Sequence, residues 1–352
     1  MRISFIIGTP LNLAQGSGTF AGLVTLAKAL RREGVAIEIV APKLRLPVFT
    51  AQRLLFNEQL RARRWDRSDL TIGIDMDGYR IAGRTGKPHV ASIKGVIADE
   101  MRFERGATRA TMSIQARCEA LHVRRADLVI TTSQYAAGRI QELYGLAEAP
   151  AIIPELIDLA AWQELFARNP VAAAPEKFTI LTVCRFYPRK RLHLLLGAAA
   201  RLRGEIHGLE VRIVGGGPEA KRLHSIWREK KLENTVHWPG DLSTDELARE
   251  YNRCDVFCLP SVQEGFGIVF LEAMAAGKPI VAARAGAAPE VLEHGLLAEP
   301  ESEESLAEAL LRLYREPGLR ATLADAGKRT VMNFNAPDVA RMFLESVRPL
   351  LI

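Results

Sequence analysis

Two glutamates frame a glycine-rich turn in the segment Glu264 to Glu272, which reads EGFGIVFLE. A strand expected over 256–260 runs into this turn, and a helix expected over 267–276 leaves it. Backbone N–H groups of residues 265–268 can therefore face an anion at the positive end of a helix dipole. Glu272 lies roughly 7–8 Å along the helix axis from the turn. The spacing fits a diphosphate with a sugar at one end and a ribose at the other. The alternative is a surface glutamate beside an incidental turn.

A second pair of charged residues follows another expected strand. The strand over 179–184 ends at Arg185, and Lys190 comes five residues later. When a sugar leaves a nucleoside diphosphate, negative charge grows on the departing phosphate oxygens. Fixed cations and backbone N–H groups can stabilise that charge without a metal. The sequence therefore predicts that Arg185 and Lys190 bind the leaving phosphate.

Other motifs give weaker signals. The runs 16–21 and 215–220 have the glycine spacing of a dinucleotide-binding loop, with Ala in the third position. Neither has a well-placed carboxylate to hold a ribose, so a nicotinamide site is disfavoured. Asp75 and Asp77 have the spacing of a metal-binding DxD motif, but a solvated turn is the favoured interpretation. The seven histidines are scattered without zinc-ligand spacing, and no phosphate loop of the GxxxxGK[ST] type occurs.

Short Val-, Ile- and Leu-rich runs alternate with helical patterns along the whole chain, which predicts two doubly wound α/β domains with parallel sheets. Strands are expected over 3–7, 36–40, 70–74, 89–93, 128–132, 179–184, 210–214, 235–238, 256–260 and 279–283. Helices are expected over 18–32, 111–125, 192–202, 219–230, 244–252, 267–276, 305–313, 318–326 and 338–350. The predicted organisation is a first domain over 1–168, a linker over 169–177, a second domain over 178–334 and a final helix over 335–352.

Composition excludes several classes of protein. Hydrophobic residues make up 48% and charged residues 25% of 352 residues, which fits a packed enzyme-sized chain rather than a disordered one. No run is long and apolar enough for a membrane span. The start of the chain reads as a strand rather than a signal peptide, and four cysteines without a CxxC pair suggest reduced thiols. The sequence thus predicts a cytoplasmic protein.

The net charge of +6 lies entirely in the first half, because residues 171–352 carry equal numbers of basic and acidic residues. Six arginines gather in one amphipathic stretch: Arg45, Arg53, Arg61, Arg63, Arg64 and Arg67. The favoured interpretation is a half-buried helix with solvated arginines. The alternative is a surface that rests on an anionic membrane, at the inner face of which the enzyme would be peripheral. Nucleic acid is not expected as a partner.

Taken together, these motifs resemble family-four glycosyltransferases (glycosyl transferases group 1). The resemblance rests on Glu264 to Glu272, on Arg185 to Lys190, on the 215–218 turn, on Gly240 before a helix start and on 286–290. It implies the GT-B fold, with two facing Rossmann-like domains, the donor nucleotide held mainly by the second domain and the acceptor by the first, and a last helix that crosses back. It also implies a retaining, metal-independent hexosyltransferase that needs no cofactor and takes a UDP- or GDP-sugar as donor. The acceptor would be a glycan, a lipid-linked molecule or a small molecule, which fits polysaccharide biosynthesis.

The resemblance also implies roles for individual residues. Arg185 and Lys190 would bind the diphosphate, Glu272 the ribose and Glu264 the donor sugar. Backbone contacts to the donor would come from Gly16, Gly215, Gly265, Phe266, Gly267 and Ile268, and the base would lie near Trp238 and Leu242. Lys94 stands where many members have a histidine, and it could support the leaving phosphate or sugar hydroxyls as a cation. It cannot reproduce the acceptor role of a neutral imidazole.

An acceptor site is expected near Arg102, Arg105 and Arg109, whose charges suit an acceptor that carries phosphate or is linked to a lipid. Two other functions remain open. One is a sugar-nucleotide epimerase of similar fold, which would act without an acceptor. The other is a sugar-nucleotide-binding protein without catalytic activity.

Overall fold

The computed structural model describes residues 1–9, 18–44, 46–172 and 174–351. The chain forms two compact units: unit 1 comprises Met1–Leu156 with Ala336–Ile352, and unit 2 comprises Ile157–Asn335. The division falls after Leu156, whereas the sequence predicted a linker over 169–177. That segment belongs to unit 2, where the buried side chain of Asn169 donates to Asp245 Oδ1 at 2.7 Å.

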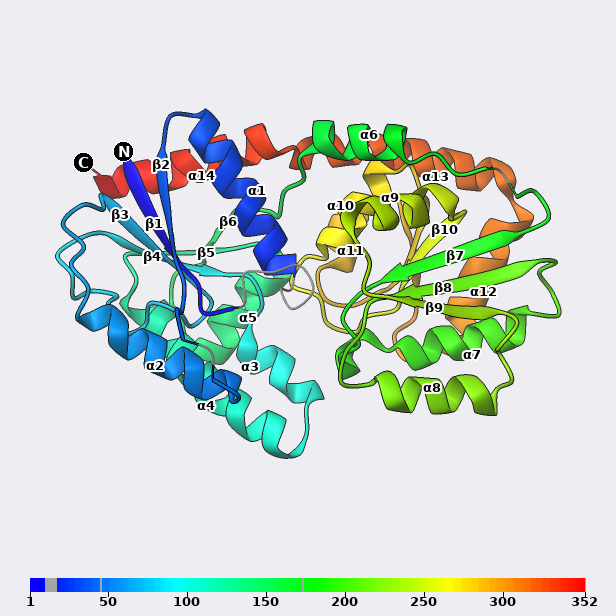
Figure 1. Cartoon of the computed structure of the whole chain (residues 1–352), viewed down its shortest axis with the longest axis horizontal. Coiled ribbons are helices and arrows are strands. Elements are labelled where there is room, and N and C mark those ends of the chain that lie inside the picture. The colour runs from blue at the N-terminus through cyan, green and yellow to red at the C-terminus, as the bar shows by residue number, and fades with distance from the viewer. Residues whose placement is uncertain (10–17, 45, 173, 352) are drawn as a thin grey trace. The chain divides into compact units, whose positions relative to one another are not determined.

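Unit 1 is built on a sheet of six parallel strands in the order β2-β1-β3-β4-β5-β6 (Figure 1). These strands are β1 (Arg2–Ile6), β2 (Ala36–Val40), β3 (Leu70–Ile74), β4 (His89–Ile93), β5 (Leu128–Thr131) and β6 (Ala151–Ile152). The helices are α1 (Gly18–Arg32), α2 (Phe49–Arg61), α3 (Ile97–Glu100), α4 (Gly106–Arg125), α5 (Gln134–Tyr144) and α14 (Ala336–Val347). Helices α1 and α14 cover one face of the sheet, and α2 to α5 cover the other. Burial on both faces explains the largely apolar sequences of the central strands β1, β3, β4 and β5, whereas the edge strand β2 is partly exposed.

Unit 2 contains a second parallel sheet in the order β12-β11-β10-β7-β8-β9. Its strands are β7 (Phe178–Val183), β8 (Leu209–Val214), β9 (Val236–Gly240), β10 (Val256–Leu259), β11 (Ile280–Ala283) and β12 (Leu296–Ala298). The helices are α6 (Leu159–Arg168), α7 (Leu192–Leu202), α8 (Ala220–Glu229), α9 (Thr244–Arg253), α10 (Ile268–Ala275), α11 (Ala288–Val291), α12 (Glu303–Arg315) and α13 (Pro317–Thr330). Short 3-10 turns occupy Met101–Phe103, Pro188–Lys190, Val331–Phe334 and Arg348–Leu351.

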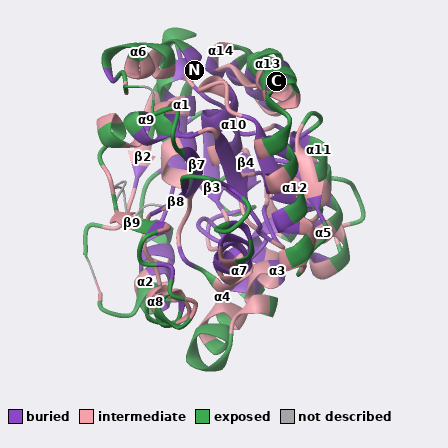
Figure 2. Ribbon diagram, turned by 90° about the vertical axis from the view of Figure 1, so that its right-hand side faces the viewer, coloured by how far each residue is buried: buried purple, intermediate pink, exposed green. Residues whose placement is uncertain are grey.

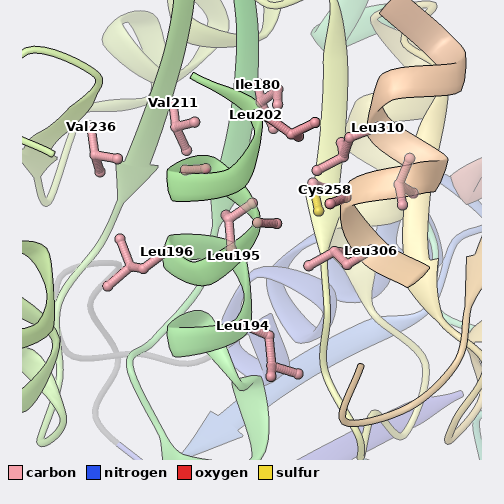
Figure 3. Close-up of a cluster of buried hydrophobic side chains, with 14 of the residues drawn as sticks. Ile180, Leu194, Leu195, Leu196, Leu202, Val211, Val236, Cys258, Leu306 and Leu310 are labelled. Carbon is pink, nitrogen blue, oxygen red and sulfur yellow. The ribbon is translucent and has the colours of Figure 1, made fainter. Parts of the chain in front are cut away.

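The largest apolar core of unit 2 lies between its sheet and the pair α7 and α12 (Figure 3). Leu306 and Leu310 of α12 recur at helical spacing and are buried against Leu195 of α7 and Ile180 of β7. Figure 2 shows the same arrangement as purple strands, with exposed residues on the outer sides of helices such as α12. Because this packing fixes the sheet, the loops at the carboxyl ends of its strands start from rigid positions.

The predicted α/β class with two doubly wound parallel sheets is confirmed. Most predicted elements match to within a few residues, and the half-buried helix favoured for the basic stretch is α2. Elements that were not assigned are α3, α5, α6, α11, β6 and β12, and α4 starts at Gly106 rather than at residue 111. Within the described ranges, no helix combines the length and apolarity that crossing a membrane requires.

Candidate active site

The strand order of unit 2 changes direction between β7 and β10, and ligands of such sheets bind at the carboxyl ends of the strands beside this point. The segment after β7 carries Arg185 and Lys190, and the segment after β10 carries Glu264. The predicted charged residues of unit 2 therefore follow the two strands that flank the switch point.

Lys190 and Glu264 form an ion pair between Lys190 Nζ and Glu264 Oε1, with side chains only 11% and 9% exposed. Burial alone would raise the pKa of Glu264, but the ammonium of Lys190 and the nearby guanidinium of Arg189 help to outweigh it, and the pKa lies below its usual value. Glu264 is therefore a carboxylate at neutral pH. The sequence treated the two residues as separate contacts, to the diphosphate and to the sugar, whereas the structure joins them.

The loop that carries Glu264 is fixed by the neighbouring loop after β11. Ala287 donates its backbone N–H to the carbonyl oxygen of Glu264 at 3.0 Å. Gly286 has φ +59°, and a Cβ there would lie 2.7 Å from Glu264 N. Only glycine fits this left-handed, crowded position. The loops after β10 and β11 are therefore packed tightly against each other.

Helix α10 begins beside this loop. Its N-cap is Gly267, with φ +91°, so the N-cap residue itself offers no side chain to the N–H groups of the first turn. Phe266 is buried, with its ring 5.5 Å from that of Phe334. The structure thus places the predicted Gly265 to Ile268 turn at the start of a helix, where backbone N–H groups can meet an anion.

Glu272 lies inside α10, buried, and it accepts a hydrogen bond from the hydroxyl of Tyr251 on α9 at 2.7 Å. Burial raises the pKa of Glu272 to about 7, although the Tyr251 hydrogen bond opposes this. Glu272 is therefore poised between its neutral and charged forms near pH 7. In the described residues, no hydrogen bond joins Glu272 to Glu264, in keeping with two separate carboxylate positions.

Arg185 lies at the edge of the site. Its Nη1 is 3.3 Å from Asp241 Oδ1, with side chains 34% and 53% exposed, so solvent screens the pair. The 215–217 turn packs against the end of β7. A Cβ on Gly215 would lie 2.2 Å from the carbonyl oxygen of Cys184, and one on Gly217 would lie 2.6 Å from Phe186 N. Close packing thus accounts for Gly215 and Gly217.

The region predicted for the base has an internal packing role as well. The Trp238 ring lies 4.6 Å from His224 and 5.7 Å from Phe186. Leu242 is half-buried just before the capped start of α9 at Ser243. Any contact to a base from this segment would therefore come from backbone groups and from the edge of the Trp238 ring.

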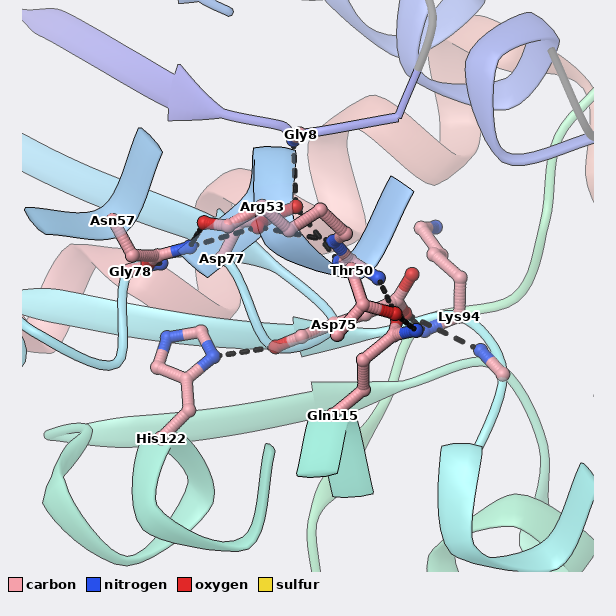
Figure 4. Close-up of polar contacts among 11 residues, drawn as sticks. Gly8, Thr50, Arg53, Asn57, Asp75, Asp77, Gly78, Lys94, Gln115 and His122 are labelled. Carbon is pink, nitrogen blue, oxygen red and sulfur yellow. Dashed lines mark hydrogen bonds and ion pairs between the residues drawn. The ribbon is translucent and has the colours of Figure 1, made fainter. Parts of the chain in front are cut away.

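In unit 1, Lys94 follows β4 and is not a free cation. Its Nζ lies 3.1 Å from Glu155 Oε1, with side chains 11% and 9% exposed. Its backbone N–H donates to Asp75 Oδ1 at 2.9 Å (Figure 4). Arg102 pairs with the buried Asp99 at 2.9 Å. Arg105 and Arg109 are exposed, and no ion pair within the described ranges connects these three arginines to Lys94.

The favoured interpretation of Asp75 and Asp77 as a solvated turn is wrong. Asp77 is fully buried, where it accepts hydrogen bonds from Gly8 N at 2.6 Å and from Asn57 Nδ2 at 3.0 Å, and it pairs with Arg53 at 2.8 Å (Figure 4). Asp75 instead binds the turn after β4. Both carboxylates therefore connect strand ends, and no group of three or more metal-ligating side chains occurs among the described residues.

The same network corrects the view of the basic stretch. Arg53 is one of the predicted solvated arginines, yet only 4% of it is exposed, since α2 turns it inward to Asp77. Arg61 and Arg63 do lie at the surface, in pairs with Glu58 and Glu38. Two predicted residues, Gly16 and Arg45, lie outside the described residues.

Two residues of the candidate sites were missed from the sequence. Glu155 follows the two-residue strand β6, which was not predicted, and Tyr251 looks like any helix aromatic. Both act through partners that are distant in sequence, Lys94 and Glu272. The one sequence signal is their position: Glu155 comes three residues after a strand end, and Tyr251 lies on the inner face of an amphipathic helix.

Comparison with known proteins agrees with this geometry. Residues 164–330 match the family described as glycosyl transferases group 1. The chain is 30% identical over 223 residues to the GDP-mannose-dependent alpha-(1-6)-phosphatidylinositol monomannoside mannosyltransferase of Mycobacterium tuberculosis (strain CDC 1551 / Oshkosh). That alignment covers 58% of this chain and 57% of the relative, so the match spans little more than half of the relative's length.

Two solved structures share the fold over nearly the whole chain. Sucrose-phosphate synthase (tll1590) from Thermosynechococcus elongatus has a TM-score of 0.86 at 21% identity, with 99% of this chain and 98% of that one covered. Anabaena Alr3699/HepE in complex with UDP and glucose has a TM-score of 0.75 at 20% identity, with 99% and 100% covered. Residues 164–330 thus resemble glycosyl transferases group 1, and the two parallel six-stranded sheets of the chain are those of the GT-B fold.

Proposed function

We propose that this protein is a retaining glycosyltransferase that moves a sugar from a nucleoside-diphosphate sugar to a hydroxyl-bearing acceptor without a metal ion. The observation that carries the proposal is the buried Lys190–Glu264 pair beside the uncapped start of α10, at the switch point of unit 2. A fixed ammonium and backbone N–H groups suit a diphosphate, and the adjacent carboxylate suits sugar hydroxyls.

In the proposed reaction, the bond between the anomeric carbon and the leaving phosphate oxygen breaks, and a bond to the acceptor oxygen forms on the same face. The proton of the acceptor hydroxyl passes to the leaving phosphate. Lys190, Arg185 and the N–H groups at the start of α10 would stabilise the developing charge. Glu264 would hold the donor sugar, and Glu272 would accept hydrogen bonds from the ribose hydroxyls.

The names of similar proteins suggest which donors to test first. The mycobacterial relative is named as GDP-mannose-dependent, and the Anabaena structure holds UDP and glucose. We therefore expect one of UDP-glucose, GDP-mannose or an ADP-sugar to raise the melting temperature. A ligand at 100 times its Kd stabilises a protein by about 2.7 kcal/mol, which is a shift of several degrees.

Turnover then separates three functions. Product that forms only with an acceptor supports the transferase, and NMR of the new anomeric centre shows whether configuration is retained. An altered donor without acceptor would indicate an epimerase, and binding without turnover would indicate a sugar-nucleotide-binding protein. If none of the nucleotide sugars shifts the melting temperature, the proposal is wrong.

A further inference from the structure

Lys94 and Glu155 form a second buried ion pair, at the carboxyl ends of β4 and β6 in unit 1. The distance from Lys94 Nζ to Glu155 Oε1 is 3.1 Å, and about a tenth of each side chain is exposed. The sequence predicted Lys94 as a cation for a leaving phosphate or for sugar hydroxyls. Glu155 neutralises this ammonium, as Glu264 neutralises that of Lys190. The Lys190 pair lies beside the start of α10, whose N–H groups add positive charge for a phosphate, whereas the N–H groups of Lys94 and Gly95 are already bonded to Asp75.

The second carboxylate oxygen of Glu155 lacks a hydrogen-bond donor among the described residues. Glu155 Oε2 is buried, and it accepts no hydrogen bond from any residue in the described part of the chain. Leaving a buried acceptor unsatisfied costs about 1–3 kcal/mol, and such an atom in a folded protein calls for an explanation. A ligand that donates a hydrogen bond would supply the missing partner.

Helix α1 packs closely against this oxygen. A Cβ on Gly22 would lie 2.5 Å from Glu155 Oε2, so any larger residue there would displace the carboxylate. The other half of the pair is fixed by Asp75, whose Oδ1 accepts hydrogen bonds from the backbone N–H groups of Lys94 at 2.9 Å and Gly95 at 3.4 Å. Donor and acceptor are therefore both held in place before any ligand arrives.

The chemistry of the pair selects its ligand. A carboxylate oxygen repels phosphate, while an ammonium has further N–H donors that can meet a neutral oxygen. A hydroxyl group can satisfy both, because it donates to Glu155 Oε2 and accepts from Lys94 Nζ. We propose that Lys94 and Glu155 together bind a sugar hydroxyl. This inference rests on the proposed function, which supplies two ligands with hydroxyl groups: the donor sugar and the acceptor.

The test measures sugar and phosphate binding separately. Saturation-transfer NMR would follow titrations with methyl α-D-glucopyranoside, methyl α-D-mannopyranoside and inorganic phosphate, and calorimetry would compare UDP with UDP-glucose and GDP with GDP-mannose. The variant is Glu155→Gln. Its matched control is Glu33→Gln, which makes the same charge change at an exposed position of unit 1.

In Glu155→Gln we expect a sugar affinity about tenfold weaker, the usual loss for a hydrogen bond to a charged group. The affinity for UDP and GDP stays unchanged, and phosphate binds more tightly because Lys94 has lost its carboxylate. A weaker affinity for the methyl glycosides would identify the bound hydroxyl as that of the acceptor. The other outcome is that methyl glycosides bind as before, but UDP-glucose no longer binds more tightly than UDP, or GDP-mannose no longer more tightly than GDP. In that case the hydroxyl belongs to the donor sugar.

Sugar affinities equal to those of the wild type and of Glu33→Gln would overturn the inference, as would a Glu155→Gln protein that binds phosphate no more tightly than the wild type does. Because Glu155→Gln leaves an unpaired buried ammonium, Lys94→Met/Glu155→Gln provides a second variant without buried charge. It should keep the fold and lose sugar affinity without gaining phosphate. Nucleotides that bind with no sugar effect contradict this inference alone, whereas nucleotides and nucleotide sugars that fail to bind contradict the proposed function.

Discussion

The ammonium of Lys190 contacts the carboxylate of Glu264 across the switch point of unit 2, in a pair with about a tenth of each side chain exposed. The two residues are 74 positions apart in the sequence. Desolvating both charges costs free energy that their attraction and a bound ligand must offset. A buried pair at the ligand-binding edge of a sheet is therefore better explained by function than by stability.

Breaking this pair on one side should destabilise the protein strongly. Lys190→Met leaves the Glu264 carboxylate buried without its cation, and we expect a loss of about 3–5 kcal/mol in the free energy of unfolding. Glu264→Gln should cost a similar amount by leaving the ammonium unpaired. Urea denaturation of both variants measures the loss.

The double variant Lys190→Met/Glu264→Gln serves as the control for that prediction. It removes both charges, so its loss should be smaller than the sum of the single losses. Under the proposed function it should still turn over at least about 100-fold more slowly than the wild type, since a cation at the leaving group is missing. Additive stability losses together with normal turnover would contradict both roles.

The sequence predicted the residues of unit 2 better than it predicted their partners. Arg185, Lys190, Glu264 and Glu272 all follow or enter elements with clear hydrophobic patterns, so their places at the sheet edge follow from strand and helix boundaries. Ion-pair partners depend on which strands become neighbours in the sheet. The strand order β10-β7-β8 cannot be predicted from the hydrophobic pattern of each strand alone. The pairing of Lys190 with Glu264 was missed for this reason.

Unit 1 shows the same limit more clearly. Arg53 looked like one of six surface arginines, because burial of a guanidinium depends on a carboxylate supplied from β3 by Asp77. Glu155 was missed because β6 has only two residues and leaves almost no pattern. Lys94 by itself lacks the acceptor capacity of an imidazole. The structure shows that Glu155 brings a carboxylate acceptor to Lys94.

Glu272 should make nucleotide binding depend on pH near neutrality. Its pKa is raised to about 7, and only the ionised form can accept hydrogen bonds from both ribose hydroxyls through both oxygens. Nucleotide affinity should therefore rise as pH increases through 7, with release of a proton on binding. Calorimetry in buffers of different ionisation enthalpy, from pH 6 to 8.5, measures both effects.

Tyr251→Phe tests whether Glu272 is the titrating group. The Tyr251 hydrogen bond lowers the pKa of Glu272, so its removal should move the midpoint of the pH profile upward. Glu272→Gln should bind nucleotide weakly and lose this dependence, which leaves only the titration of the nucleotide itself. A profile identical in all three proteins would assign the pH effect to another group.

A buried histidine pair should make unit 1 sensitive to acid. His89 Nε2 and His122 Nε2 are 2.7 Å apart, and His122 Nδ1 donates to the carbonyl oxygen of Asp75. Both rings are neutral, because burial lowers the pKa of His122 to about 4 and that of His89 well below its usual value. The unfolded chain therefore binds more protons below pH 6.5, and stability from this pair is lost as pH falls from 6.5 towards 4.

The effect is best measured as a difference between proteins, since the raised pKa values of Asp75 and Glu272 act in the opposite direction over this range. Each imidazole contributes up to about 1.4 kcal/mol per pH unit. His122→Gln should thus lose less stability than the wild type between pH 6.5 and 5 in urea denaturation. The exposed His294→Gln should follow the wild type, and a His122→Gln curve parallel to the wild type would refute the prediction.

Gly286→Ala should disturb the site without touching a charged group. The new Cβ would lie 2.7 Å from Glu264 N and 2.9 Å from Glu264 O, and φ at this position is +59°. Both backbones would have to move, so we expect a loss of about 1–3 kcal/mol in unfolding free energy and a weaker affinity for the nucleotide sugar. The control is Gly318→Ala in α13, where a Cβ meets no atom within 4 Å and alanine should be neutral or stabilising by up to about 1 kcal/mol. Equal stability and equal nucleotide-sugar affinity in the two variants would mean that the Gly286 loop does not position Glu264.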